Sequence, residues 1–496
     1  MKLRMTLKKS LMHQLSPMIP CWTGWRRIIS SEFQKFSSQF CVVLNVMMTP
    51  LIQILKSLLF FLVCLPMVAG ESSWPHWRGP NFDGSVGDDL AYPQSFGKST
   101  NVRWSYPTPG TSASTPIVTS KFVFLSSVED RKNIKANTSK LLAICLDRKT
   151  GKVIWLNHAG SGYLPGLNHG NEHQLDSKSN YASPSPVVGR NEVVFFYGNG
   201  DLVCYEFDGE LRWRRNLQQD YGDFCFQWTF SASPTILSNS LYLPVLQRDS
   251  KVHGRGVDGA ESFILKLNLS DGTTSWKVLR QTDARMESRE SFASVIPYAG
   301  NLLVAGGDYL TCHSAASGKE LWRWGTWNVG HKQEWWRLVP SPVAGAGRVL
   351  VCAPKGNPVY AIDVGVKGTS AKLSWDSSSI RRVTTDVPTP LFYRDHFYIL
   401  SDLKKILFKI NPSGEVVWES KLPGKYKWRS SPTGADKKVF LMNHNAHVLV
   451  ISSEDGSLLN SVKMGDEYDD STRSSIALTG GSLFIRTNKI LYCIGE

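Results

Sequence analysis

Charged and aromatic side chains recur at one register of this sequence, a few residues before the small residue that begins an apolar strand. The members of this set are Arg289, Glu290, Trp336, Arg337, Asp386, Trp428, Arg429 and Arg473. Guanidinium groups pair with carboxylates through two parallel hydrogen bonds, and indole and guanidinium planes stack on flat molecules. The ligand that suits these residue types is therefore an anionic, planar small molecule.

The same residues also allow a structural interpretation. Three arginines aimed at one place repel one another unless acids or a bound anion compensate their charge. Glu290, Asp386 and Asp470 are the internal candidates for this compensation. If they neutralise the arginines fully, the set is a structural rim and not a binding site, and the sequence leaves both interpretations open.

A second group of polar residues occupies a long insertion. Its members are His158, His169, Glu172, His173 and Asp176. Two histidines four positions apart share one face only in a helix, and the glycine-rich flanks argue against a helix here. We predict no metal site in this segment. The chain also lacks a Gly-x-Ser-x-Gly elbow, a phosphate-binding glycine loop and a Cys-x-x-Cys pair.

An internal repeat supplies the elements that must position the charged set. Six segments contain a small polar residue and then a tryptophan, with a Gly turn between them in all but the fifth, and the tryptophans are 58, 63, 46, 53 and 43 residues apart. A unit of about 45 residues holds four short strands. We interpret the tryptophans as contacts between neighbouring units and not as ligand cages. With the matching residue near the N-terminus they are Trp104, Trp155, Trp213, Trp276, Trp322, Trp375 and Trp418.

The two ends of the repeat region predict a closed ring. The last unit, residues 474–494, stops before its tryptophan strand, and residues 101–104 resemble such a strand with no unit before it. Joining them completes an eighth unit and removes the open sheet edges of a linear array. The sequence therefore predicts an all-β, eight-bladed β-propeller of four-stranded antiparallel blades, closed by pairing of the N- and C-terminal strands.

The charge of the chain is uneven. The formal net charge is +14, but residues 1–70 contain eight Lys or Arg and one acid, which leaves +7 on the remaining 426 residues without a basic run. Bulk charge therefore gives no support for nucleic-acid binding.

An apolar run over residues 58–69 follows Lys56 and ends in small residues, which is typical of a signal peptide and too short to span a membrane. We then expect translation to start at Met47 or Met48. We expect a leader and signal peptide over residues 1–70, an N-terminal segment over 71–100 and the propeller over 101–496. The mature protein would be periplasmic or secreted, without an integral membrane segment after cleavage.

The segment from Cys145 through Asp147 and Gly151 to Trp155 resembles the docking repeat of propellers that bind pyrroloquinoline quinone (PQQ). Cys204, Cys312 and Cys493 take the small position of Cys145 in other units, where cysteine acts as a small hydrophobe. The opening residues 74–81 and the segment 305–308 are also similar to parts of secreted bacterial PQQ-like propeller proteins. That group is related to quinoprotein alcohol dehydrogenases and to the lipoprotein of the outer-membrane barrel-assembly machinery.

The resemblance implies two functions. One is a PQQ-dependent alcohol or sugar dehydrogenase with the quinone and Ca²⁺ at the channel mouth. The other is a non-enzymatic module that binds protein partners in the cell envelope, or an anionic small molecule. The adjacent-cysteine disulfide of the enzymes is missing, and no Ca²⁺ ligand set can be assigned. We expect the binding or scaffold module, with the dehydrogenase as the alternative.

Overall fold

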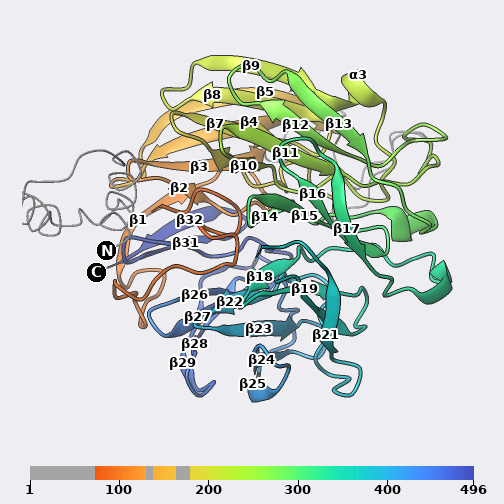
Figure 1. Ribbon diagram of the computed structural model, residues 1–496. Coiled ribbons are helices and arrows are strands. Elements are labelled where there is room, and N and C mark those ends of the chain that lie inside the picture. The colour runs from red at the N-terminus through yellow and green to blue at the C-terminus, as the bar shows by residue number, and fades with distance from the viewer. Residues whose placement is uncertain (1–72, 130–137, 164–178, 366, 496) are drawn as a thin grey trace, which may run out of the picture. The chain divides into compact units, whose positions relative to one another are not determined.

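The computed structural model describes residues 73–129, 138–163, 179–365 and 367–495. The expected leader and residues 164–178 of the histidine-containing insertion lie outside this part of the chain. The described strands form eight four-stranded sheets, and every pairing within them is antiparallel. These sheets are the blades of the predicted propeller (Figure 1). The predicted fold class is confirmed.

Seven blades take their strands in chain order. The first strand of each blade is its shortest, and it is the innermost strand of that blade. Blades 1 to 3 comprise β2 (Ile117–Val118), β3 (Phe122–Val128), β4 (Thr138–Asp147), β5 (Val153–Tyr163), β6 (Val187–Val188), β7 (Glu192–Phe196), β8 (Asp201–Glu206), β9 (Leu211–Asn216), β10 (Thr235–Leu237), β11 (Ser240–Val245), β12 (Phe263–Asn268) and β13 (Thr274–Leu279). Blades 4 and 5 comprise β14 (Ile296–Tyr298), β15 (Asn301–Gly306), β16 (Tyr309–Ser314), β17 (Glu320–Trp324), β18 (Val343–Gly345), β19 (Arg348–Cys352), β20 (Val359–Asp363) and β21 (Lys372–Asp376). Blades 6 and 7 comprise β22 (Leu391–Tyr393), β23 (His396–Ser401), β24 (Ile406–Ile410), β25 (Val416–Lys421), β26 (Thr433–Ala435), β27 (Lys438–Met442), β28 (His447–Ser452) and β29 (Leu458–Lys463).

Blade 8 joins the two ends of the described chain. It contains β30 (Ala477–Thr479), β31 (Ser482–Arg486) and β32 (Ile490–Ile494), and its outermost strand is β1 (Val102–Pro107). Trp104 pairs with Cys493 in an antiparallel register, and Figure 1 shows β1 beside β32. The predicted closure is confirmed, and it leaves no blade with a missing strand.

A circle of hydrogen bonds marks the inner wall of the ring. In each blade a Ser or Thr just before the innermost strand accepts a hydrogen bond, at 2.9–3.2 Å, from the backbone N–H of the equivalent residue in the preceding blade. The eight residues, all buried, are Thr115, Ser185, Ser233, Ser294, Ser341, Thr389, Ser431 and Ser475. The last bond runs from Ser475 N–H to Thr115 Oγ1, so the circle is complete. These bonds satisfy backbone donors that the short strands leave without sheet partners.

The repeat tryptophans connect neighbouring blades. Six of them donate the indole N–H to a backbone carbonyl of the next blade at 2.8–3.1 Å, and these are Trp104, Trp155, Trp213, Trp276, Trp322 and Trp375. The turn glycine of the next blade lies against the ring: a Cβ on Gly151, where φ is +69°, would be 2.5 Å from Trp104. Trp418 lies in the same way against Gly456. Because a side chain at these turns would collide with the indole, the repeat keeps Gly and Trp together.

The ring has two faces, which we name from the direction of the innermost strands. The innermost strand of each blade begins at the face that we call the top face. It ends at the face that we call the bottom face. Residues 73–100 pack on the bottom face, where Trp74 exchanges backbone hydrogen bonds with Val118 of β2, and Gly84 accepts one from Gly434 of β26. The helices α3 (Leu217–Tyr221), η1 (Met286–Arg289) and η2 (Val329–His331) follow outermost strands and so belong to the top face. No helix among the described residues is long and apolar enough to cross a membrane.

Candidate functional site

The top face brings part of the predicted charged set together. Arg337 precedes β18, Asp386 precedes β22 and Arg429 precedes β26, so three successive blades place them at one end of the ring. Asp386 Oδ2 lies 3.8 Å from Arg337 Nη2 and 3.4 Å from Arg429 Nη2. We call these residues, with Glu287 and Asp402, the top-face ion network.

Glu287 and Asp402 extend this network at its two ends. Arg337 Nε is 3.9 Å from Glu287 Oε1, and Arg429 Nε donates to Asp402 Oδ2 at 3.0 Å. Burial raises the pKa of Asp402, while the Asp386 backbone N–H and Arg429 oppose that rise. Each arginine therefore lies between two carboxylates. Asp386 has the compensating position that the sequence suggested, whereas the acids at the two ends of the network are Glu287 and Asp402 in place of the suggested Glu290 and Asp470.

Arg289 and Glu290 take part in separate contacts. Glu290 is fully buried, pairs with Arg248 and accepts the Gln227 backbone N–H at 3.0 Å. Burial raises the pKa of Glu290 to about 7 against the opposing effect of Arg248. Arg289 instead pairs with Asp249 at 3.3 Å. The two neighbours thus bind different partners and do not form one ligand-binding unit.

The two predicted stacking residues differ in exposure. Trp428 is fully buried in the core between blades 6 and 7, and its N–H donates to the Pro423 carbonyl at 3.2 Å. Trp336 is half-buried against the core of blades 4 and 5, and its backbone N–H donates to Ser288 Oγ at 2.8 Å. A fully buried indole has no free ring face, so only Trp336 keeps exposed surface.

Alongside burial, Arg473, the last member of the set, lowers the pKa of His444 through its positive charge. Burial, Arg473, Arg429 and Lys427 together lower the pKa of His444 to about 3. His444 therefore stays neutral at neutral pH.

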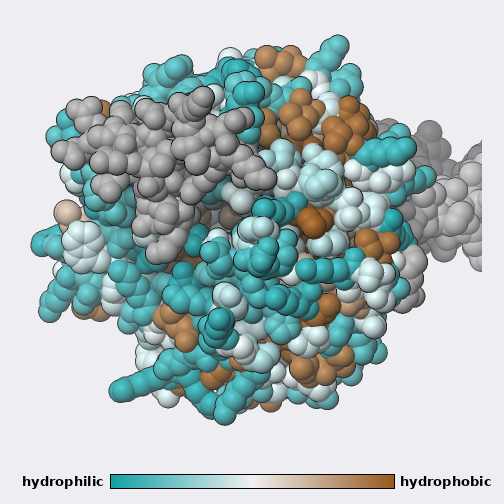
Figure 2. Space-filling model, turned by 180° about the vertical axis from the view of Figure 1, so that it is seen from behind, coloured by the Kyte–Doolittle hydropathy of each residue, from teal (hydrophilic) through white to brown (hydrophobic). Residues whose placement is uncertain are grey.

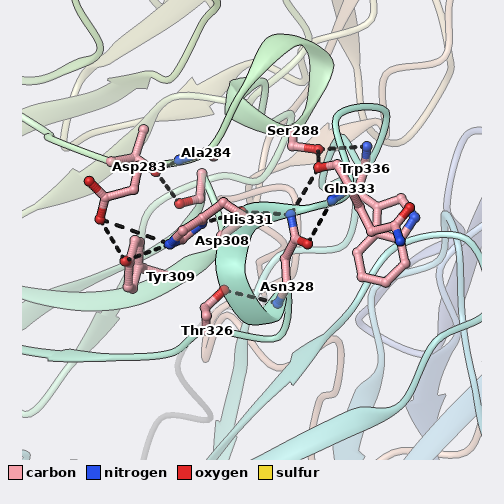
Figure 3. A network of polar contacts seen from close by, with 12 residues as sticks. Asp283, Ala284, Ser288, Asp308, Tyr309, Thr326, Asn328, His331, Gln333 and Trp336 are labelled. Carbon is pink, nitrogen blue, oxygen red and sulfur yellow. Dashed lines mark hydrogen bonds and ion pairs between the residues drawn. The ribbon is translucent and has the colours of Figure 1, made fainter.

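A second polar network on the top face was not selected from the sequence (Figure 3). Asp308 is fully buried, and its Oδ2 accepts hydrogen bonds at 2.8 Å from both His331 Nδ1 and Asn328 Nδ2. The other imidazole nitrogen, Nε2, is 3.3 Å from the Tyr309 hydroxyl, which donates to Asp283 Oδ2 at 3.0 Å. We call this the Asp308–His331 network. Its signals in the sequence were an acid two residues after the end of an apolar strand and the resemblance of segment 305–308.

The cysteines fit a packing role. All six in the described residues are free and buried. Burial raises the pKa of Cys204 and of Cys312 to about 12, so both thiols stay protonated and unreactive at neutral pH.

The described residues do not fit PQQ with Ca²⁺. A quinone with three carboxylates needs cationic donors that are free to pair with it, but Arg337 and Arg429 already lie between acids and Trp428 has no free ring face. Among the described side chains, no three His, Cys, Asp or Glu residues are grouped to hold a metal ion. We therefore derive no redox step for this face.

Comparison with known proteins identifies relatives of the whole ring. The family model described as outer membrane protein assembly factor BamB matches residues 95–242, 142–384 and 366–492. The chain is similar in structure to BamB from Moraxella catarrhalis, at a TM-score of 0.52 and 13% identity over 80% of this chain and 99% of that one. No curated protein matches it by sequence.

Two enzymes share the fold. A europium-containing methanol dehydrogenase matches at a TM-score of 0.58 and 10% identity, over 84% of this chain and 90% of that one. The quinohemoprotein alcohol dehydrogenase of Comamonas testosteroni matches at 0.56 and 12% identity, over 86% and 81% of the two chains. At such low identity these similarities establish the fold alone.

Proposed function

This chain belongs to the family described as outer membrane protein assembly factor BamB, and from that premise we propose that it is an exported propeller that binds protein partners in the cell envelope. The proposal covers export, the envelope location and the role as a binding or scaffold module. It is a function of surfaces and does not require chemistry in the channel.

The single observation that carries the proposal is the internal neutralisation of the top-face ion network. Arg337 and Arg429 are held between Glu287, Asp386 and Asp402, and all five side chains are at least four-fifths buried. Such a network rigidifies the loops that it connects, because Arg337, Arg429 and Asp386 each contact two oppositely charged partners. A rigid, internally satisfied rim favours a scaffold over a quinone enzyme.

The outer strands are the surface that suits a protein partner best. Each blade ends in a strand with one unpaired edge, and several of these strands carry an exposed apolar side chain. These residues include Ile154, Leu211, Leu321, Leu373, Val417 and Leu458, all 41–54% exposed. The side of the molecule drawn in Figure 2 is mainly hydrophilic, with apolar residues in scattered patches and not in one broad face. A partner strand that pairs with an outer edge would cover such residues.

Photo-crosslinking in intact cells tests the proposal. A photoreactive residue at Leu211 or Val417 should give a discrete adduct in the envelope fraction. A photoreactive residue at Leu90, an exposed position of the N-terminal segment, is the matched control and should give no such adduct. Recovery of the protein from the cytoplasm alone would refute the export part of the proposal.

Titration with PQQ and Ca²⁺ separates the two functions that the resemblance implied. We expect no saturable change in quinone absorbance or tryptophan fluorescence at micromolar PQQ. Saturable binding that is lost in both Arg337→Ala and Arg429→Ala would overturn the scaffold proposal in favour of the dehydrogenase.

A further inference from the structure

We propose that the Asp308–His331 network is a binding site for a divalent transition-metal ion such as Zn²⁺, held by His331 Nε2, the Asp283 carboxylate and the Tyr309 hydroxyl oxygen. These three residues come from loops and a strand start where blades 3 and 4 meet on the top face. The site is independent of the insertion and of the top-face ion network, and it does not depend on the proposed function.

The three donor atoms form a triangle whose shortest side is shorter, and whose longest side is longer, than the ligand spacing of a zinc site. Tyr309 Oη is 3.0 Å from Asp283 Oδ2 and 3.3 Å from His331 Nε2, and the remaining side, from His331 Nε2 to Asp283 Oδ2, is 3.9 Å. Zinc bonds to nitrogen and oxygen of about 2.0–2.2 Å place ligands of a tetrahedral site roughly 3.3–3.6 Å apart. The Asp283 side chain is 76% exposed, so it is free to rotate and shorten the long side.

Asp308 prepares the imidazole for a metal ion. Its buried carboxylate accepts the hydrogen bond from Nδ1, which fixes the tautomer with the proton on Nδ1 and a lone pair on Nε2. A carboxylate behind a histidine in this way is the usual outer-shell partner of a metal-binding imidazole. Figure 3 shows Nε2 turned toward Tyr309 and Asp283.

The loop that carries His331 is held in place before any ion binds. Asn328 donates to Asp308 and to the Gln333 carbonyl at 2.8 and 2.9 Å, and its Oδ1 accepts the Gln333 backbone N–H at 3.0 Å. Thr326 Oγ1 accepts the Asn328 backbone N–H at 2.9 Å. A preformed loop avoids the entropy of ordering a ligand on binding, which favours affinity.

The local charge tolerates a cation. Arg323 lies 4.6 Å over the Tyr309 ring, but Glu320 pairs with it at 2.8 Å. Arg280 is fully buried behind Tyr309 and donates to its backbone carbonyl. These two guanidiniums face three carboxylates, those of Glu320, Asp283 and Asp308, so the surroundings keep one net negative charge. An ion held by three side chains has at least one position left for water or for a carboxylate of a partner.

Titration of the purified protein with Zn²⁺, and with Co²⁺ as a spectroscopic substitute, tests the site. We expect one tight equivalent and a Co²⁺ visible spectrum typical of a nitrogen–oxygen site. His331→Ala should weaken binding at least a hundredfold and abolish the spectrum, and Asp283→Asn should weaken binding at least tenfold. His396→Ala, which removes a half-buried histidine in blade 6, is the matched control and should bind as the wild type does.

Asp308→Asn and Tyr309→Phe separate ligation from folding. Asp308 is a positioning residue, so its variant should keep the Co²⁺ spectrum while the affinity falls about ten- to a hundredfold. Tyr309→Phe should shift the spectrum, because one oxygen ligand is lost, while the melting temperature of the metal-free protein stays unchanged. Binding that is equal in wild type and His331→Ala, or absent from the wild type at a hundred micromolar Zn²⁺, would overturn the proposal.

Discussion

The two faces of the ring differ in what closes them. On the bottom face the chain covers its own blades with residues 73–100, through backbone hydrogen bonds and the fully buried Trp74 and Arg78. Arg78 Nη2 donates to the carbonyls of Pro390 and Pro432, just before β22 and β26, at 3.1 and 2.9 Å, so this buried side chain is held by backbone carbonyls. On the top face the loops are held by ion pairs between side chains. The bottom face is thus held mainly by the backbone contacts and packing of residues 73–100, and the top face mainly by ion pairs between side chains.

Removal of residues 73–100, which cover the bottom face and which we call the bottom cover, should have the largest effect on the stability of the ring. Deletion of residues 71–106 removes the N-terminal segment and the outermost strand of blade 8, so the ring should lose its closure and unfold at much lower denaturant concentration. Urea unfolding followed by tryptophan fluorescence measures this. A truncated protein with the wild-type midpoint would falsify the role of β1 in closure.

Loss of one buried side chain of the bottom cover should have the next largest effect on the free energy of unfolding. Trp74→Ala leaves a cavity against β2 and should lower the free energy of unfolding by about 3–5 kcal/mol. Trp335→Ala is the matched control on the top face, where the indole is 53% exposed, and should change it far less. Equal losses in both variants would contradict the difference between the faces.

The top-face ion network should give a smaller loss. Asp402→Asn keeps the shape of the side chain but leaves Arg429 with Asp386 as its one remaining carboxylate. Because both side chains are mostly buried, we expect a loss of about 1–3 kcal/mol in the free energy of unfolding. Asp88→Asn breaks the more exposed pair with Arg394 on the bottom face and should cost about 0–1 kcal/mol. High salt should reduce the Asp88 effect more than the Asp402 effect, which a repeat of both measurements in 1 M NaCl would show.

Acid should destabilise both faces through one buried histidine each. Burial lowers the pKa of His76 on the bottom face to about 4, and burial with nearby cations lowers that of His444 on the top face to about 3. The unfolded chain takes up these protons near pH 6.5 while the folded chain does not, so stability is present above pH 6.5 and is lost as the pH falls toward 4.

His76→Gln and His444→Gln should each reduce that loss by about 3 kcal/mol between pH 7 and pH 4. Unfolding curves at a series of pH values measure the slopes. Only the His444 effect should shrink in high salt, because only His444 depends on neighbouring cations. If neither substitution changed the slope of unfolding free energy against pH, the acid sensitivity could not come from His76 and His444.

Much of the fold could be predicted because the repeat is local. The Gly turn and the tryptophan are determined by one hairpin and its contact with the next, and the missing strand at one end matched the extra strand at the other. The charged set was harder to interpret. The register placed Arg337, Asp386 and Arg429 at one face, but the partners Glu287 and Asp402 come from different positions in their blades and have no shared pattern.

The sequence by itself determined the number of blades, the pairing of the two ends and the face to which the arginines belong, because each follows from a repeat with a fixed strand count. Only the tertiary structure decided how the charges pair, that residues 73–100 cover the bottom face, and that His331 meets Asp308, Tyr309 and Asp283. Those outcomes depend on where loops of unequal length bring side chains in space. A repeat constrains the strands, but the loops between blades vary freely as long as the strands still pair.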